Sequence, residues 1–460
     1  MTEEFVDQGG AASSSPSGFK RFLGSIILPR ILSSKRRSKR RARFEAARIR
    51  ADEPHRIEYF HQIDDPYSYL AAQQLEALCQ RYQVELVCHL IAGPTGKNLP
   101  EPDLLLAYGR MDCEQVAPWY GLEFPRPCCV PDPAAVASAA AILAGVSQQQ
   151  FAAAAVAAGK ALWNGDGAGL AALVNSYPAA SPLKTAQCIE SGTARQRSLK
   201  HFSGAMFYYG EEWYWGVDRL YHLEHRLLEL GLGDGELLQP RPPLVYGPLR
   251  DSGALTLEIY PSLRSPYTAI SFDVSLAMAA AAGVKVTVKP VVPMVMRGVA
   301  LTREKSAYIL MDTAREEASL GVSGFGRMYD PIGEPVRRAF SLYPWAHSRG
   351  KGAEYISAFL QAAFYRGVNT LRDSGQRWVV ERAGLSWQDA RLAIDQPGWG
   401  AQLERNRQEM YDWGSWGVPS YRLLDANGES LGQFWGQDRL WVISRIIQRH
   451  LQQTATNTTA

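Results

Sequence analysis

Ser265 stands before a predicted helix, at a position where its hydroxyl could donate a hydrogen bond to an anion. It stands immediately before Pro266 and a stretch, 267–283, with helical composition, and proline is well tolerated in the first turn of a helix. The N–H groups and the dipole of a helix N-terminus stabilise a negative charge such as a thiolate. Serine is also a good N-cap before any helix, so the residues alone leave both roles open for Ser265.

Asp438 has the same ambiguity before the last helix that the sequence predicts, 438–451. Its carboxylate could bind a ligand or cap the helix. Asp218 stands in the same way before an earlier predicted helix, 218–230. Other candidate residues differ between these two parts of the chain, so the persistence of the aspartate favours capping and leaves ligand binding as the alternative.

Cysteine and histidine chemistry is restricted by the placement of these residues. All six cysteines lie in the first half of the chain, and no Cys-x-x-Cys is present, so neither the usual redox pair nor a zinc-ribbon spacing is available. The adjacent Cys128 and Cys129 could form a redox switch, but two buried or partly buried thiols are expected. His222 and His225 lie one helical turn apart without a cysteine or carboxylate set around them, and we expect no metal site.

The chain contains related sequence twice, at a distance of 200 residues. The tetrapeptide at 57–60 corresponds to that at 257–260, and the match continues in one register for about 65 residues. Near the end of each half, Trp-Gly-Val-Asp-Arg-Leu at 215–220 mirrors Trp-Gly-Gln-Asp-Arg-Leu at 435–440. A period this large predicts two duplicated domains rather than a solenoid.

Each half is predicted to begin with a strand, a helix and a second strand, the order of a βαβ unit with parallel strands. These strands are expected at 56–60, 84–90, 256–260 and 284–291, with helices at 67–82 and 267–283. A helical stretch follows at 134–173 and 354–390, then a strand at 205–209 and 420–424, and then the last helix of each half. This order predicts an α/β protein of two tandem thioredoxin-like domains, each with a helical insertion.

The composition also indicates domain boundaries. We expect a disordered tail at 1–18, a basic amphipathic segment at 19–54, an N-terminal thioredoxin-like domain at 55–237, a Pro-rich linker at 238–253, a C-terminal thioredoxin-like domain at 254–452 and a second disordered tail at 453–460. A Gly- and Ser-rich tail cannot bury enough apolar surface to fold.

The composition is that of a soluble globular protein, with 46% hydrophobic and 21% charged residues among 460. The net charge of +3 conceals twelve Lys or Arg residues between positions 20 and 50 against one acid, Glu45. The two halves are therefore negative overall, and we expect no nucleic-acid binding. No run of 18 apolar residues and no secretory signal are present, so the expected location is cytoplasmic.

The basic segment carries apolar residues at helical spacing among its cations. Phe19, Phe22, Leu23, Ile26 and Ile27 recur in this way. The pattern favours contact with a membrane surface through residues 19–50 over a nucleic-acid arm. A solvated helix packed on a domain is the remaining interpretation.

Three motifs in order carry a resemblance to a known family. They are Ser-Pro-Tyr at 265–267, Trp-Gly-Val-Pro at 416–419 and the hexapeptide at 435–440. Together they resemble the DsbA-like thioredoxin superfamily, in the branch of 2-hydroxychromene-2-carboxylate isomerases and kappa-class glutathione transferases. The resemblance covers about 55–235 and 254–452. It implies a glutathione-dependent isomerase or transferase that acts on small aromatic or electrophilic compounds.

The resemblance assigns roles to residues of the second half. Ser265 matches the family's catalytic serine, which stands where redox relatives carry their reactive cysteine. Pro419 matches the family's cis-proline, and the residue before it, Val418, would pair through its backbone with the cysteinyl part of glutathione. Gln437 and Asp438 match the residues that hold the γ-glutamyl group in kappa-class relatives. Glutathione is thereby implied as the cofactor, and a serine hydroxyl donating to its sulfur would lower the pKa of the thiol.

The resemblance also points to a cationic loop. In the hydroxychromene isomerases a polar and cationic set receives the carboxylate substrate. The corresponding loop here, after the second strand of the second half, contains Arg297, Arg303 and Lys305. A solvated surface position is an equally open interpretation for each of the three.

The first half departs from this pattern. Asp65 stands at the position of the serine, Met206 at that of the cis-proline and Val217 at that of the glutamine, while Asp218 persists. A carboxylate beside the glutathione sulfur would repel a thiolate. We therefore expect this half to be structural and catalytically degenerate, with a changed chemistry using Asp65 as a general base as the alternative.

Two other functions are alternatives to a glutathione-dependent enzyme. The redox members of the superfamily suggest a thiol–disulfide oxidoreductase, although position 265 lacks a cysteine. A non-catalytic scaffold, in which both halves only pack, is the third hypothesis.

Overall fold

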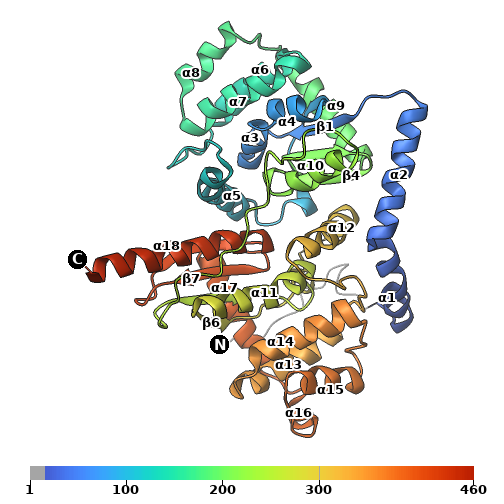
Figure 1. The fold of residues 1–460 in the computed structure, drawn as a ribbon, viewed down its shortest axis with the longest axis vertical. Coiled ribbons are helices and arrows are strands. Elements are labelled where there is room, and N and C mark those ends of the chain that lie inside the picture. The colour runs from blue at the N-terminus through green and yellow to red at the C-terminus, as the bar shows by residue number, and fades with distance from the viewer. Residues whose placement is uncertain (1–15, 300, 460) are drawn as a thin grey trace. The chain divides into compact units, whose positions relative to one another are not determined.

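The computed structural model describes residues 16–299 and 301–459, which fall into two compact units (Figure 1). The N-terminal unit is Ser38–Pro242, and the C-terminal unit combines the residues up to Arg37 with those from Pro243 on. Most of the first predicted tail, residues 1–15, lies outside the described residues. Each unit is described by itself.

The N-terminal unit contains a four-stranded sheet made of β1 (Arg56–His61), β2 (Glu85–Leu90), β3 (Met206–Tyr209) and β4 (Glu212–Trp215). The strand order is β2-β1-β3-β4, with β1 parallel to β2 and antiparallel to β3, and β3 antiparallel to β4. Five of the six residues of β1 are buried, which suits a central strand with helices on both faces.

The C-terminal unit repeats this topology with β5 (Thr256–Tyr260), β6 (Lys285–Val288), β7 (Ser420–Leu424) and β8 (Ser430–Trp435). The order is β6-β5-β7-β8, again with one parallel and two antiparallel pairs. The predicted fold class is confirmed: the chain is an α/β protein with two thioredoxin-like domains.

Helices of the N-terminal unit surround its sheet. The single helix predicted at 67–82 is in fact two, α3 (Pro66–Ala72) and α4 (Leu75–Tyr82), separated where the Gln73 side chain pairs with both backbone groups of Glu123. The inserted helices are α5 (Pro102–Val116), α6 (Pro133–Gly145), α7 (Gln148–Asn164), α8 (Gly167–Ala172) and α9 (Pro182–Ser198), and the unit's last helix is α10 (Leu220–Glu229). Alanines on α6 and α7 are buried where these two helices pack.

The helical insertion of the C-terminal unit is longer than predicted. α11 (Pro266–Ala282) lies between β5 and β6, and the insertion consists of α12 (Arg303–Ser319), α13 (Glu334–Ser348), α14 (Gly352–Leu360) with a π-helical turn (Gln361–Arg366), α15 (Asp373–Arg382), α16 (Trp387–Ala393) and α17 (Trp399–Asp412).

The last helix, α18 (Leu440–Thr459), corrects the second predicted tail. Residues 453–459 continue the helix instead of being disordered. The hydroxyls of Thr454 and Thr456 donate to the carbonyls of His450 and Gln452, one turn earlier. These polar side chains thus bond along the helix itself, which the composition of the segment did not indicate.

The basic segment forms two helices, α1 (Gly18–Leu32) and α2 (Ser34–Arg50). Ser33 between them is extended, and its hydroxyl accepts a hydrogen bond from the N–H of Arg36, as an N-terminal cap does. α1 belongs to the C-terminal unit, whereas most of α2 belongs to the N-terminal unit. Over residues 16–299 and 301–459, no helix has both the length and the apolar character that crossing a bilayer requires.

Candidate functional site

Ser265 forms the N-cap of α11, after the loop that leaves β5. Its backbone is extended, with φ −89° and ψ 118°, and its Oγ accepts a hydrogen bond from the N–H of Thr268 at 3.2 Å. Pro266 occupies the first turn, where the missing N–H costs nothing. Only 9% of Ser265 is exposed. The capping role is therefore present in the structure, and the hydroxyl lies at the positive end of the helix dipole.

The sheet brings Ser265 next to a cis-peptide. The bond between Val418 and Pro419 is cis and directly precedes β7. Because β7 runs antiparallel to β5, with Ser420 opposite Tyr260, the start of β7 lies beside the end of β5. Across 153 positions of sequence, the Ser265 Oγ donates to the carbonyl of Val418 at 3.3 Å. Two of the three family motifs therefore meet at this point.

Two tryptophans lie beside the cis-peptide. The rings of Trp416 and Trp435 have centroids 4.8 Å apart. Gly417 separates Trp416 from Val418, and any side chain at this position would collide with the Trp435 ring, so a glycine is needed for this packing. The indole Nε1 of Trp416 is buried and has no hydrogen-bond partner among the residues that the structure describes.

The third motif is tied to the second by a backbone hydrogen bond. The N–H of Gly436 donates to the carbonyl of Pro419 at 2.9 Å. The short 3-10 helix Gln437–Arg439 follows and leads into α18. Gln437 is buried, and its amide donates to Glu316 of α12 at 3.4 Å. Asp438 is partly exposed, and its carboxylate lies 3.7 Å from the guanidinium of Arg439.

Two of the three cations of the predicted loop approach the segment that leads to the cis-peptide. The guanidinium of Arg297 lies 5.9 Å from the ring centroid of Tyr411, and the ammonium of Lys305 lies 5.9 Å from that of Trp416. Burial lowers the pKa of Lys305. Arg303, in the first turn of α12, is exposed, so the structure does not draw it into this group.

Arg297 has unused donors. Its Nε and Nη2 are buried, and neither finds a hydrogen-bond partner within residues 16–299 and 301–459. A buried donor without an acceptor costs free energy in the folded protein. An anionic ligand that reached this guanidinium would recover that loss.

An ion pair next to Ser265 was not foreseen from the sequence. Arg264 forms two hydrogen bonds to the Asp330 carboxylate, at 3.0 and 3.1 Å. Burial would raise the pKa of Asp330, but Arg264 outweighs it and the pKa lies below its usual value. Arg21 of α1 donates to the carbonyl of the same aspartate and, at 2.6 Å, to that of Ile332. No local pattern links residues this far apart in sequence.

A second polar group lies behind the start of α11. The Tyr267 hydroxyl donates to the Asp312 carboxylate at 2.8 Å, and Arg315 donates to the other carboxylate oxygen at 3.0 Å. Asp312 and Arg315 are buried. The repeat contained the signal for this contact, because Tyr67 and Asp112 stand 200 positions earlier.

The N-terminal unit has a carboxylate where the C-terminal unit has the serine. Asp65 caps α3 and accepts hydrogen bonds from the N–H of Ser68 at 3.0 Å and from its hydroxyl at 2.7 Å. Burial raises the pKa of Asp65 to about 6. In the corresponding 3-10 helix, Val217–Arg219, Asp218 accepts a hydrogen bond from Tyr120 at 2.8 Å.

The residue at the position of the cis-proline is Ala205, which corrects the match to Met206. Met206 pairs with Trp215 as Ser420 pairs with Trp435. The carbonyl of Ala205 accepts the N–H of Gly216 at 2.7 Å, in the way that Pro419 accepts that of Gly436. Strand register thus shifts the correspondence by one residue, which sequence matching across the unequal insertions did not resolve.

None of the six cysteines, which all lie within residues 16–299, forms a disulfide. Cys128 is partly buried, and burial together with Glu114 raises the pKa of its thiol to about 11. Cys129 is exposed, which corrects the expectation that both thiols of the pair are covered. The raised pKa disfavours the thiolate form at Cys128.

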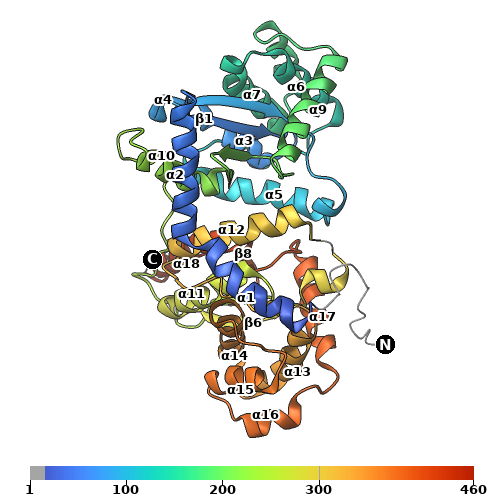
Figure 2. The same ribbon diagram turned by 90° about the vertical axis from the view of Figure 1, so that its right-hand side faces the viewer.

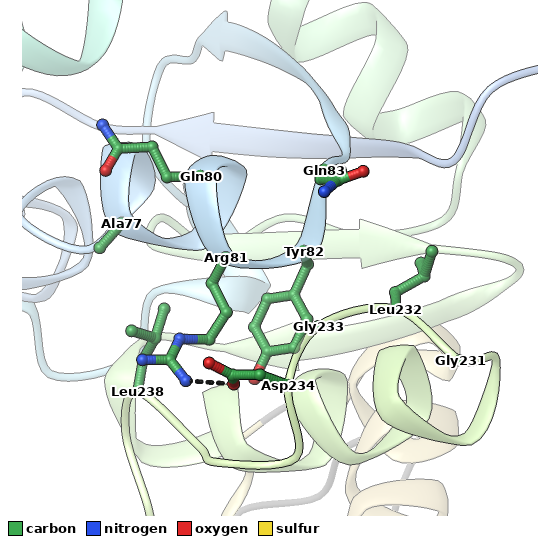
Figure 3. A pocket seen from close by; sticks show the side chains of 10 residues that line it. All are labelled: Ala77, Gln80, Arg81, Tyr82, Gln83, Gly231, Leu232, Gly233, Asp234 and Leu238. Atoms are coloured by element: carbon green, nitrogen blue, oxygen red, sulfur yellow. Dashed lines mark hydrogen bonds and ion pairs between the residues drawn. The ribbon is translucent and has the colours of Figure 1, made fainter.

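A hollow of about 640 Å³ lies elsewhere, in the N-terminal unit (Figure 3). Arg81, Tyr82, Asp234 and Leu238 are among the residues that line it. Three of its polar side chains are already engaged, because Arg81 pairs with Asp234 at 2.6 Å and the Tyr82 hydroxyl donates to the buried Glu224 at 2.8 Å. None of the predicted site residues lines this hollow.

The comparison with known proteins identifies the C-terminal fold. Residues 256–448 match the family model of the DSBA-like thioredoxin domain. This match agrees with the superfamily that the three motifs indicated. A comparison with curated proteins found no match.

Solved structures with a similar chain include isomerases and redox proteins. A 2-hydroxychromene-2-carboxylate isomerase is 17% identical, with 44% of this chain and 98% of that chain covered and a TM-score of 0.37. A probable DsbA oxidoreductase from Streptomyces coelicolor is 18% identical, with 43% and 89% covered and a TM-score of 0.33. The cytosolic disulfide reductase DsbM from Pseudomonas aeruginosa is 16% identical, with 44% and 98% covered and a TM-score of 0.33.

Proposed function

We propose that the DSBA-like thioredoxin domain at residues 256–448 binds glutathione beside Ser265 and acts as a glutathione-dependent isomerase or transferase on small aromatic or electrophilic compounds. The observation that carries the proposal is the 3.3 Å contact between the Ser265 hydroxyl and the carbonyl of Val418 in the cis-peptide. It joins a helix N-terminus, a hydroxyl and the backbone carbonyl of the cis-peptide at one point.

The Ser265 hydroxyl has the hydrogen-bonding capacity that this role needs. One lone pair accepts the N–H of Thr268, which holds the oxygen in place. The single hydroxyl proton is directed at the Val418 carbonyl, and a rotation about the C–O bond would turn it toward another acceptor. A hydrogen bond to a thiolate favours the charged form and lowers the pKa of the thiol.

Glutathione, when bound, would supply the nucleophilic sulfur. The residues around Ser265 fit such a ligand. The Val418 carbonyl is a backbone acceptor for the cysteinyl part, and Gln437 and Asp438 follow a strand end that is bonded to Pro419 through Gly436. The unsatisfied donors of Arg297 suit a carboxylate, of which glutathione has two.

The neighbouring side chains also suit an aromatic or electrophilic second substrate. The partly exposed Trp435, which packs on the buried Trp416, offers a ring surface beside the cis-peptide, and aromatic rings associate favourably in offset or edge-on arrangements. Lys305, whose ammonium lies over Trp416, would add a positive charge for an acidic group on that substrate.

Dithiol chemistry has no support in this domain. Residues 189–460 contain no cysteine, so the C-terminal unit cannot itself form and break the disulfide that a thiol–disulfide oxidoreductase uses. A glutathione-dependent reaction requires only the thiol of the ligand. This contrast favours the isomerase or transferase hypothesis over the redox one.

The proposal is tested by calorimetric titration of the full chain with glutathione. We expect about one equivalent to bind the wild type, because one unit carries the motif residues, and weaker binding by Asp438→Ala. An absence of heat together with no thermal stabilisation of the wild type would reject glutathione binding and leave the non-catalytic scaffold as the best hypothesis.

The chain itself suggests a variant that separates capping from chemistry. Asp65 shows that an aspartate caps the equivalent helix, so Ser265→Asp should keep α11 capped while placing a negative charge beside the sulfur. We expect a higher pKa for the bound thiol, read from the ultraviolet absorbance of the thiolate as the pH is raised. Ser265→Ala should lose both the cap and the hydroxyl, at about 1 kcal/mol of stability.

A further inference from the structure

Helix α1 turns polar side chains toward the domain and apolar side chains toward solvent, the reverse of an ordinary surface helix. It buries Arg21 and Ser25, together with Leu32 at its end. Large apolar side chains remain in solvent over the rest of the helix: Phe19, Phe22, Leu23, Ile26, Ile27 and Ile31. Phe19 is 72% exposed and Phe22 is 56% exposed. A helix that packs on a domain normally does the reverse.

Polar contacts hold α1 in this orientation. Arg21 is only 2% exposed, and its guanidinium donates to the carbonyls of Pro16, Asp330 and Ile332. The Tyr329 hydroxyl donates to the carbonyl of Gly18 at 3.4 Å. Figure 2 shows α1 lying along the surface of the C-terminal unit. The buried arginine therefore fixes which face of the helix is turned outward.

Positive charge accompanies the exposed apolar face. Residues 16–37 contain six Lys or Arg residues and no Asp or Glu. Four of these cations are exposed: Lys20, Arg30, Lys35 and Arg36. At 100° per residue, Arg30 projects from the same side of α1 as Phe19 and Leu23, and Lys20 lies at its border. Apolar side chains framed by cations match the acyl boundary and the anionic headgroups of a lipid surface.

We propose that α1 docks the protein onto anionic lipid membranes, with Phe19, Phe22, Leu23, Ile26 and Ile27 inserted at the headgroup boundary and the surrounding cations on the headgroups. Charge complementarity selects this occupant. A nucleic acid would use the cations but gain nothing from the five exposed aliphatic and aromatic groups. A second copy of the chain would bring the same positive charge against itself.

The test is sedimentation of the full chain with vesicles of phosphatidylcholine alone or with one quarter phosphatidylserine. We expect at least tenfold stronger binding to the anionic vesicles. This binding should weaken as the salt concentration is raised, because salt screens exposed charges. Failure of the wild type to bind anionic vesicles at low salt would overturn the proposal.

Substitutions on the exposed face distinguish insertion from simple attraction. Phe22→Asp with Ile26→Asp should abolish binding to anionic vesicles without changing the melting temperature, because both side chains are exposed. Leu392→Asp is the matched control, since Leu392 is 80% exposed on α16 of the same unit, and it should bind like the wild type. Unchanged binding by the double variant would contradict the inserted face.

Light scattering in the absence of lipid tests the competing occupant. A wild-type oligomer that the double variant converts to a monomer would show that a second copy covers α1 and would reject lipid docking. A monomeric wild type that binds anionic vesicles supports the proposal. These outcomes do not depend on glutathione, so the docking surface and the proposed function fail or succeed separately.

Discussion

The hydroxyl of Tyr267 lies 2.8 Å from the carboxylate of Asp312. In the N-terminal unit, 200 positions earlier, Tyr67 and Asp112 form the same contact at the same distance. The contact joins the first turn of α11 to α12, and in the other unit it joins α3 to α5. It therefore fixes the helix end on which the serine or its aspartate counterpart lies.

Removing this hydroxyl should loosen the start of α11. In Tyr267→Phe the buried Asp312 carboxylate loses one charge-assisted hydrogen bond, and we expect the C-terminal unit to lose about 1.5–3 kcal/mol of unfolding free energy. Denaturant unfolding followed by the tryptophan fluorescence of that unit measures the loss. Tyr67→Phe is the matched change and should affect the N-terminal unit instead. An unaltered transition in Tyr267→Phe would show that other donors replace the phenol.

Arg297 should lower the unfolding free energy of the protein and strengthen its binding of glutathione. Because two of its buried nitrogens have no partner in the described part of the chain, Arg297→Met should raise the unfolding free energy by about 1 kcal/mol. The same variant should bind glutathione more weakly, because the ligand loses its unsatisfied donors. Arg303→Met, at an exposed position in the first turn of α12, is the control and should change neither quantity. A destabilised Arg297→Met that binds normally would assign this arginine to packing.

Asp65 should make the N-terminal unit less stable as the pH rises. Burial raises its pKa from 3.8 to about 6 in the folded chain, so between these values the unfolded chain releases a proton that the folded chain keeps. The contribution of Asp65 to the stability of the unit is then most favourable below pH 4 and declines until pH 6, by up to about 3 kcal/mol. Asp65→Asn cannot ionise, and its stability relative to the wild type should increase over this range in denaturant titrations. A constant difference would mean that the carboxyl ionises normally.

Glu58 in the same unit should show the opposite dependence. Burial alone would raise its pKa, but hydrogen bonds from Arg195 at 2.6 Å and His89 at 2.9 Å outweigh burial and lower the pKa from 4.5 to about 2. The stabilisation is complete above pH 4.5 and is lost as the pH falls toward 2, by up to about 3 kcal/mol. The advantage of the wild type over Glu58→Gln should therefore shrink in acid. If both unfold in parallel at every pH, the ion cluster contributes nothing.

The sequence predicted those features that depend on local pattern. The first strand of each half was expected where it forms, as at Thr256–Tyr260, and the Ser-Pro pair located the start of α11. The position of the cis-peptide at Pro419 came from the motif resemblance. A few neighbouring residues determine these features, so a local sequence pattern is sufficient to predict them.

Features that depend on distant pairing were not predicted. The match of Ala205 to Pro419 is set by strand register, and the pairing of Arg264 with Asp330 by the path of the insertion. The outward face of α1 could not be read from its spacing either, because the anchor of Arg21 lies more than 300 positions away. Apolar periodicity shows that a helix has a face, and only its partner determines where that face points.

The hydrogen bonds of Arg21 to Asp330 and Ile332 have a consequence for biosynthesis. They span 309 and 311 positions, so the first helix leaves the ribosome long before the segment that receives it has been made. The N-terminal unit, which is continuous from Ser38 to Pro242, can be completed in the meantime, whereas Arg21 of α1 must wait for the carbonyls of Asp330 and Ile332. A nascent chain stalled before residue 330 should therefore display α1 undocked and open to proteases, and protection of this helix would mark the arrival of the second domain.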